Sequence, residues 1–299
     1  MRRLALATVF AVFVGGGLFG AWSYGHDYYR YRGFPPPRQP PGVAAGRLVK
    51  VALWSPALHA RRHYDVYLPP RYAAQAARGQ RFPVLYLLHG SPGTPRLFLD
   101  AGRMGVDLDT LLAHGRIRPF LVVMPNGSDG TYRSDTEWAD TPHGRYESFV
   151  LDVVRAVDSR WPTLADRRHR AIAGNSAGAY GAVNIALHHL GTFGVVQSWS
   201  GYFHQTPTGP FKGGSAPLVR ANSPIDDVTG LNARPITAFL YGGRQDPGTR
   251  ELAAFAARLR AAGATVQTAT PPGGHDWRLW RSMTPAMLRW LSHQFGSPR

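Results

Sequence analysis

The chain has 299 residues, 44% of them hydrophobic, so it is long enough to form a large buried core. It contains no cysteine, which excludes disulfide bonds, thiolate metal sites and a cysteine nucleophile. The formal net charge of +16 comes almost entirely from arginine, and the arginines are scattered singly or in pairs. We interpret this as a generally basic surface and expect no nucleic-acid partner.

Arg2 and Arg3 follow Met1 and precede an uncharged apolar run over residues 4–24. A positive flank before about 20 apolar residues is typical of a secretory signal or a single membrane anchor. A small-x-small cleavage site is missing, which favours an uncleaved anchor over a cleaved signal, and a buried core helix fits less well than either. We therefore predict a membrane anchor or signal segment over residues 1–25. The rest of the chain is then expected outside the cytoplasm, membrane-anchored or secreted.

Residues 26–44 are rich in tyrosine, arginine and proline. The prolines cannot continue a helix or a sheet and favour an extended, semi-rigid spacer. We predict a linker here, and one folded domain over residues 45–299.

The folded part alternates strand patterns with helix patterns. Polar and apolar residues alternate over 47–55 and 61–69, which predicts an antiparallel pair at a sheet edge. Buried strands are predicted at 82–90, 119–127, 170–174, 194–201 and 235–243, and a further strand at the start of 265–274. Helices are predicted at 146–161, 177–190, 248–263 and 276–295. This order predicts an α/β fold with a mostly parallel central sheet and helices on both faces, whose ligands bind beyond the carboxyl ends of the strands.

The stretch Gly174-Asn175-Ser176-Ala177-Gly178 fits the pattern G-x-S-x-G of a nucleophile elbow. A sharp turn from strand to helix needs small neighbours, and it lifts the hydroxyl of Ser176 to a helix N-terminus, where developing negative charge is favoured. An ordinary glycine-rich turn is the alternative interpretation. The pattern makes Ser176 the candidate nucleophile.

A serine nucleophile needs a base and an acid, which follow it in the chain order of this fold. His275 follows a strand and a glycine turn, so it is the candidate base; His293, inside the last helix, is less suited. Asp246 follows the strand pattern at 235–243 and is the candidate acid that orients the imidazole. Glu251 is the second candidate acid, and Asp246 could instead only cap the helix that follows.

The oxyanion of an acyl-transfer reaction needs two N–H donors. The residue after the nucleophile, Ala177, is one candidate, and Ser91 in the glycine turn after the strand at 82–90 is the other. Two long polar and aromatic segments, 127–144 and 201–217, are expected to form a lid or rim over the serine. They make Trp138 and Tyr202 the candidate substrate-binding residues, with a sugar, an aromatic acid or a phosphate as the open possibilities.

The ordered set of motifs resembles the esterase D branch of the α/β-hydrolases, which includes S-formylglutathione hydrolase, enterochelin-type esterases, some feruloyl esterases and the mycolyltransferases. The motifs are "YLLHGSPG", "VVMPNG", "YESFVLDVV", "IAGNSAGAYGA", "LYGGRQD" and "PGGHDWRLW", and the resemblance runs from about residue 47 to the C-terminus. It implies an α/β-hydrolase fold and a Ser176–Asp246–His275 triad, with Ser91 and Ala177 as oxyanion donors. It also implies a packing or hydrogen-bonding role for Glu147.

The predicted function is cleavage of carboxylic esters through an acyl-enzyme, on a small molecule or an envelope glycolipid, with neither metal nor organic cofactor. An acyltransferase acting on envelope glycolipids is a close alternative. A catalytically silent hydrolase-fold protein that binds the cell envelope is a second alternative, from a different class.

Overall fold

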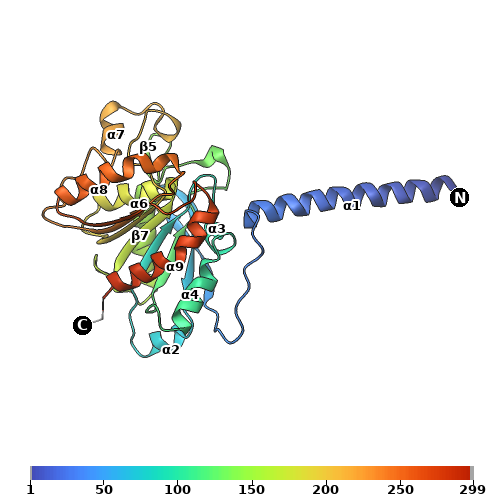
Figure 1. The fold of residues 1–299 in the computed structure, drawn as a ribbon, viewed down its shortest axis with the longest axis horizontal. Coiled ribbons are helices and arrows are strands. Elements are labelled where there is room, and N and C mark those ends of the chain that lie inside the picture. The colour runs from blue at the N-terminus through green and yellow to red at the C-terminus, as the bar shows by residue number, and fades with distance from the viewer. Residues whose placement is uncertain (1, 297–299) are drawn as a thin grey trace.

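The computed structural model describes residues 2–296, with the side chains of all of these except residues 2–11, 13 and 132. A long helix, α1 (Arg2–Tyr31), projects away from a body that is built around an eight-stranded sheet (Figure 1). The strands of this sheet are β1 (Arg47–Ser55), β2 (Ala60–Leu68), β3 (Val84–Leu88), β4 (Leu121–Pro125), β7 (Arg170–Asn175), β8 (Val195–Trp199), β9 (Thr237–Tyr241) and β10 (Thr265–Ala269). A separate two-stranded ribbon consists of β5 (Asp140–Thr141) and β6 (Gly144–Arg145).

The helices of the body are α2 (Tyr72–Ala77), α3 (Arg96–Leu99), α4 (Met104–Ala113), α5 (Tyr146–Arg160), α6 (Ala177–His188), α7 (Ala216–Ala221), α8 (Leu252–Ala261) and α9 (Trp277–Gln294). Three short 3-10 turns are η1 (Tyr132–Ser134), η2 (Gly209–Phe211) and η3 (Pro247–Glu251). The helices predicted from apolar spacing are therefore present as α5, α6, α8 and α9.

The order of the strands across the sheet is β1-β2-β4-β3-β7-β8-β9-β10. The pairs β1–β2 and β2–β4 are antiparallel, and every later pair is parallel. The predicted mostly parallel sheet with an antiparallel edge is thus observed. Strands β3, β4 and β8 are buried at every position, which explains their uninterrupted apolar sequences.

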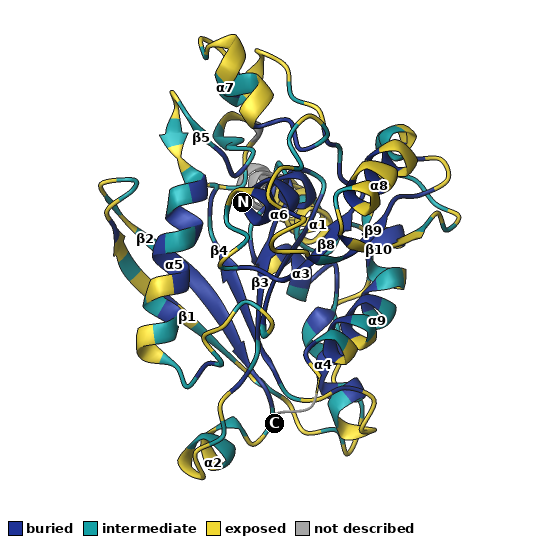
Figure 2. Ribbon diagram, turned by 90° about the vertical axis from the view of Figure 1, so that its left-hand side faces the viewer, coloured by how far each residue is buried: buried dark blue, intermediate teal, exposed yellow. Residues whose placement is uncertain are grey.

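The sheet separates two hydrophobic cores, because successive residues of a strand point to opposite faces. Tyr86 and Leu88 of β3 pack into the core covered by α5, α6 and α8, and Leu85 and Leu87 pack into the core covered by α3, α4 and α9. In Figure 2 these helices turn their buried sides towards the sheet. The layers fix the carboxyl ends of the parallel strands at one edge, which positions the loops that follow them.

The N-terminal helix is longer than the predicted boundary at residue 25, because residues 26–31 continue it. It ends where Arg32 (φ 54°) and Gly33 (φ 82°) adopt the left-handed conformation that terminates many helices. The extended stretch begins only with the proline run at Pro35, the first residues that cannot continue a helix. Only the C-terminal end of α1 lies against the body (Figure 1).

Over the described part of the chain, no helix combines the length and the apolar character that crossing a bilayer requires. The predicted membrane anchor over residues 1–25 is therefore not supported by the structure. The location of the body outside the cytoplasm stays a prediction.

Candidate active site

Ser176 lies at the junction of β7 and α6, with φ 55° and ψ −124°. Positive φ is uncommon for a residue with a side chain and costs on the order of 1–3 kcal/mol, so the surrounding packing must hold the turn in place. Its N–H donates to the carbonyl of Trp199 on the neighbouring strand β8 over 3.0 Å. The strained turn leaves the hydroxyl of Ser176 facing a pocket.

The glycines on either side of the serine are required by the close approach of β3. A Cβ at Gly178 would lie 2.0 Å from the carbonyl oxygen of Leu88, and one at Gly174 would lie 2.5 Å from the same oxygen. Across the turn, a Cβ at Gly90 would lie 3.0 Å from the Cβ of Ser176. The glycines of the motif therefore permit backbone contacts that any side chain would block.

The structure brings Ser176, Asp246 and His275 together from the ends of three strands. The Nε2 atom of His275 lies 2.8 Å from the Oγ atom of Ser176, and its Nδ1 atom lies 2.9 Å from the Oδ2 atom of Asp246. His275 lies between β10 and α9, and Asp246 follows β9 and precedes η3. The side chain of Asp246 is 1% exposed and that of His275 is 36% exposed, so the carboxylate is shielded from water while the imidazole reaches the pocket.

The carboxylate of Asp246 both caps η3 and binds His275, so the two roles considered for it are compatible. Its Oδ1 atom accepts the N–H of Gly248 over 2.9 Å, which leaves Oδ2 for the imidazole. Burial raises the pKa of Asp246, but hydrogen bonding from His275 and the Ser200 hydroxyl outweighs it, so the pKa lies below its ordinary value. The second candidate acid, Glu251, instead accepts the N–H of Phe203 over 2.9 Å.

The two candidate oxyanion donors lie on loops next to the serine. Ala177 is the first residue of α6, so its N–H has no acceptor within the helix. Ser91 follows Gly90, whose own N–H already donates to Asn175 Oδ1 over 3.1 Å. Ser91 and Ala177 line one small recess together, and Ser91 also lines the pocket of Ser176. With the N–H of Gly90 occupied, Ser91 is the next donor along this loop.

The loop that carries Ser91 is fixed by a buried, neutral histidine. Burial lowers the pKa of His89 to about 4. Its Nδ1 atom donates to the carbonyl of Gly90 over 2.9 Å, and its Nε2 atom accepts the N–H of Gly127 over 3.3 Å. The indole N–H of Trp138 donates to the carbonyl of His89 over 2.9 Å.

Trp138 was expected to contact substrate, and the structure corrects this expectation. Its side chain lies in the interior, only 1% exposed; it borders the small recess shared by Ser91 and Ala177 but does not line the pocket of Ser176. The ring fits against Gly127 and Gly181, where an added Cβ would lie 2.8 Å and 2.5 Å from Trp138. Trp138 is therefore a positioning residue that supports the Ser91 loop from inside.

Tyr202, the other expected substrate-binding residue, is also placed elsewhere. Its hydroxyl donates to the carboxylate of Glu137, and its ring stacks on Tyr180 with 5.4 Å between centroids. Burial and the neighbouring charge of Asp135 raise the pKa of Glu137 to about 7. No residue of 201–217 lines the pocket of Ser176, so this segment does not form the rim that the sequence suggested.

Glu147 has the hydrogen-bonding role that the family resemblance implies. Its carboxylate lies 2.9 Å from Nδ1 of His188 and 2.8 Å from Nε2 of His189, both at the end of α6. Burial raises the pKa of Glu147, but the hydrogen bonds and charges of the two histidines lower it by more. The pKa of Glu147 therefore lies below its ordinary value. The group joins α5 to α6 away from the pocket of Ser176.

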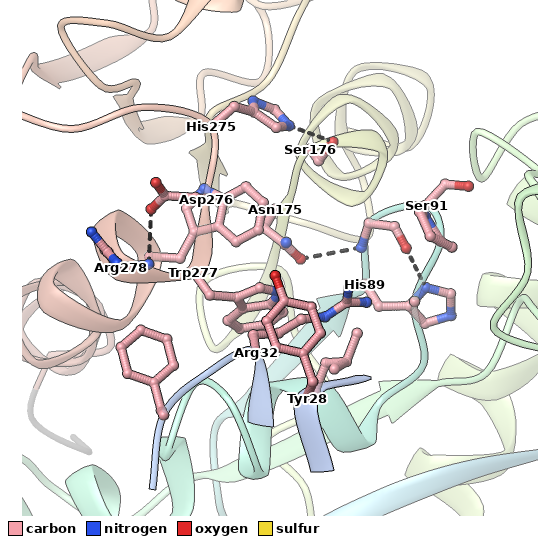
Figure 3. A pocket seen from close by; sticks show the side chains of 16 residues that line it. Tyr28, Arg32, His89, Ser91, Asn175, Ser176, His275, Asp276, Trp277 and Arg278 are labelled. Carbon is pink, nitrogen blue, oxygen red and sulfur yellow. Dashed lines mark hydrogen bonds between the residues drawn. The ribbon is translucent and has the colours of Figure 1, made fainter. Parts of the chain in front are cut away.

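The pocket of Ser176 has a volume of about 470 Å³, and sequence reasoning missed much of its lining. Trp277, Arg278 and Trp280 follow His275 directly, so their place in the chain was an available signal. The other missed residues, Tyr28, Arg32 and Phe34, come from the N-terminal segment, whose sequence gives no such signal. In Figure 3, Tyr28 and Arg32 lie across the pocket from Ser176 and His275.

A family model described as "Putative esterase" matches residues 55–291 of the chain. The chain belongs to this esterase family. The resemblance predicted from the ordered motifs is thereby confirmed, and the match leaves the first 54 residues outside the family region.

Curated relatives of this esterase-family chain are longer than it is. An endo-1,4-beta-xylanase/feruloyl esterase of Xylanibacter ruminicola is 29% identical over 169 residues, which are 56% of this chain and 22% of that protein. An esterase of Mycobacterium tuberculosis is 27% identical over 262 residues, covering 75% of this chain and 53% of that protein. The chain therefore spans about a fifth of the first relative and about half of the second.

Solved structures match the body closely. A ferulic acid esterase superposes with a TM-score of 0.73 at 26% identity, over 84% of this chain and 99% of that one. An S-formylglutathione hydrolase from Agrobacterium tumefaciens superposes with a TM-score of 0.69 at 16% identity, over 88% of this chain and 100% of that one. These likenesses confirm the predicted α/β-hydrolase fold of the esterase family.

Proposed function

We propose that this chain hydrolyses carboxylic esters through an acyl-enzyme intermediate on Ser176. The pair of contacts made by His275, 2.8 Å to Ser176 Oγ and 2.9 Å to Asp246 Oδ2, carries the proposal. A serine hydroxyl is a weak nucleophile until an adjacent base accepts its proton, and a base oriented by a buried carboxylate meets that need. Membership of the esterase family supports the reaction class.

The reaction proceeds by proton transfer and two acyl transfers. His275 takes the proton of Ser176 as the oxygen attacks the ester carbonyl carbon, and the N–H groups of Ser91 and Ala177 stabilise the oxyanion. The imidazolium then gives its proton to the departing alcohol, and Asp246 stabilises the charged ring during this step. Water, deprotonated by His275, attacks the acyl-enzyme and releases the acid, so neither a metal nor an organic cofactor takes part.

The proposal is tested with a fluorophosphonate probe and a series of 4-nitrophenyl esters on the full chain. We expect covalent labelling of the wild type, and loss of labelling in Ser176→Ala together with a decrease in kcat of about 10⁴-fold or more. The control is Ser159→Ala, because that exposed serine at the end of α5 bonds only to the carbonyl of Ala156. Folding of both variants is checked by circular dichroism.

Two results would contradict this assignment. Folded wild type that neither reacts with the probe nor releases 4-nitrophenol would favour a silent envelope-binding protein. Labelling that persists in Ser176→Ala would move the nucleophile to another residue. The comparisons give no preference for a transferase, so we expect an added sugar alcohol to leave the yield of free acid unchanged.

A further inference from the structure

One wall of the pocket comes from outside the region shared with the esterase family. Tyr28, Arg32 and Phe34, which we call the N-terminal wall, line the pocket together with Ser176 and His275. The family match begins at residue 55, so the family pattern does not supply this wall. Figure 3 shows Tyr28 and Arg32 reaching the pocket from the N-terminal ribbon.

Specific contacts hold the N-terminal wall against the body. The Nε atom of Arg30 donates to the Oδ2 atom of Asp100 over 2.7 Å, and the side chain of Asp100 is only 10% exposed. The guanidinium of Arg281 in α9 lies over the ring of Phe34, 4.5 Å from its centroid. Arg32 lies between these two anchors, in the left-handed turn that ends α1. The turn presents Arg32 to the pocket.

The pocket carries an excess of positive charge. Arg32 and Arg278 line it, and in the described part of the chain neither forms an ion pair; the guanidinium of Arg32 lies over the ring of Tyr29, 5.2 Å from its centroid, and its Nε atom is buried without a hydrogen-bond partner. Asp276 supplies the one carboxylate among the lining residues, and its Oδ1 atom accepts the N–H groups of Arg278 and Leu279 over 2.9 Å and 3.1 Å. The pocket lining therefore holds two guanidinium groups and one carboxylate, which is already engaged in capping α9.

We propose that Arg32, with Arg278, binds a carboxylate carried by the ester, so that the substrates of this pocket are esters bearing a second, anionic group. The inference rests on the proposed esterase function, since it names the substrate class of that site. A guanidinium presents its donors in a planar fork that matches the two oxygens of a carboxylate, and Arg32 has no carboxylate partner among the described residues. The acyl group to be transferred lies at Ser176, and the anion lies across the pocket at Arg32, while Arg278 adds positive charge from α9.

The test compares matched ester pairs. Mono-4-nitrophenyl esters of succinic, glutaric and adipic acid are assayed beside the same compounds with the free carboxylate methylated, after subtraction of spontaneous hydrolysis. We expect the wild type to prefer the best anionic ester over its methylated partner by about 10- to 100-fold in kcat/KM. Raising the ionic strength to 0.5 M is expected to reduce this preference.

The variants assign the preference to one side chain. Arg32→Gln is expected to lower kcat/KM for the anionic ester by about 10- to 100-fold and to change that for the methylated ester by less than about threefold. Arg32→Lys keeps the charge but loses the planar fork, so it should retain part of the preference. Arg38→Gln is the control, because it removes an exposed arginine from the same N-terminal segment outside the pocket.

Measurements of binding test the carboxylate site independently of ester hydrolysis. Calorimetry on Ser176→Ala measures the affinity for both esters of each pair without turnover. If Ser176→Ala binds the anionic esters more tightly than the methylated ones, and the double variant Ser176→Ala/Arg32→Gln does not, the carboxylate site is supported. This holds even if no ester is cleaved. Equal affinity for the anionic and methylated esters, or equal losses for both in the Arg32→Gln variant, would overturn it and leave the ester hydrolase proposal standing.

Discussion

The two sides of the pocket are fixed in different ways. The side that we call the reacting wall, residues 89–93, 175–176, 275–277 and 280, is supported by backbone contacts, such as the close approach of Leu88 to Gly178 that excludes a Cβ there. The N-terminal wall is set by side chains, chiefly the ion pair of Arg30 with Asp100 and the stacking of Arg281 on Phe34. A substitution can remove a single side-chain contact, whereas it leaves the backbone atoms, and therefore the contacts between them, in place. We therefore expect mutations on the two walls to differ in kind, with those on the reacting wall changing kcat and those on the N-terminal wall changing the choice of substrate.

After loss of Ser176 itself, the largest effect is expected from Asp246→Asn, which acts on the reacting wall through His275. The amide cannot hold the imidazole in the tautomer that accepts a proton from Ser176, so kcat should fall by about 10²- to 10⁴-fold with little change in KM. Glu251→Gln is the control, because its amide oxygen still accepts the N–H of Phe203 and it does not contact His275. Steady-state kinetics with a 4-nitrophenyl ester distinguishes the two candidate acids. A larger loss in Glu251→Gln than in Asp246→Asn would reverse the assignment.

Gly178→Ala tests whether close backbone contacts at the turn around Ser176 support the reacting wall. The added methyl group would lie 2.0 Å from the Leu88 carbonyl oxygen, so β3 and α6 must separate. We expect the free energy of unfolding to fall by about 1–3 kcal/mol or more, and kcat to fall by about 10²-fold as Ser176 moves relative to His275.

Gly105→Ala is the control for Gly178→Ala, because it adds a methyl group at a glycine that is not crowded. Its added Cβ would meet only Leu99, at an ordinary 3.8 Å, and the position lies inside α4, where alanine is the better helix former. We expect unchanged activity and a gain in the free energy of unfolding of about 0.4–1 kcal/mol, measured by urea denaturation. Equal losses in the two alanine variants would contradict the role given to the elbow glycines.

The sequence predicted the reacting wall better than the rest because its signals are local. Apolar runs such as 121–125 mark buried strands, and Ser176 and Asp246 each follow such a run within a glycine-bearing turn, while His275 follows the more exposed strand β10 and a glycine turn. Trp138 could not be placed in this way. Its interior site exists because Gly127 and Gly181, distant in sequence, leave room for the ring. The N-terminal wall was missed for a related reason, since the partners of Arg30 and Phe34 lie in α3–α4 and α9 and become neighbours only in the folded chain.

Glu137 lies outside both walls, and its ionisation is expected to make the stability of the protein depend on pH. Its pKa rises from 4.5 to about 7 on folding, chiefly through burial. Between these values the folded state keeps a proton that the unfolded state releases, so the stability of the protein decreases as pH rises through this window. Glu137→Gln removes the cost of ionisation and keeps an acceptor for Tyr202. We expect the variant to be more stable than the wild type by about 1–3 kcal/mol at pH 8, and the difference to vanish below pH 4.5.

Glu147→Gln should have the opposite sign, because the histidines of α6 hold the pKa of Glu147 below its ordinary value. Its carboxylate stabilises the fold above the unfolded pKa of 4.5, and that contribution is lost as pH falls through the lower, folded pKa. Urea titrations of the wild type and both variants at pH 5, 6.5 and 8 measure the two signs side by side. A stabilised Glu147→Gln, or a Glu137→Gln whose advantage does not grow with pH, would contradict these assignments.

The smallest effect is expected from Arg30→Gln, which weakens the N-terminal wall without touching the pocket. Arg30 is 39% exposed and Asp100 keeps a second partner in Arg96 at 3.3 Å, so the free energy of unfolding should fall by less than about 1 kcal/mol. The geometry around Ser176 does not depend on this pair, so kcat should stay constant. KM for an anionic ester should rise by about two- to fivefold, because Arg32 is less firmly held and more of its freedom is lost on binding. A fall in kcat of the same size as the change in KM would show that the two walls are coupled, and the separation of chemistry from selection would not hold.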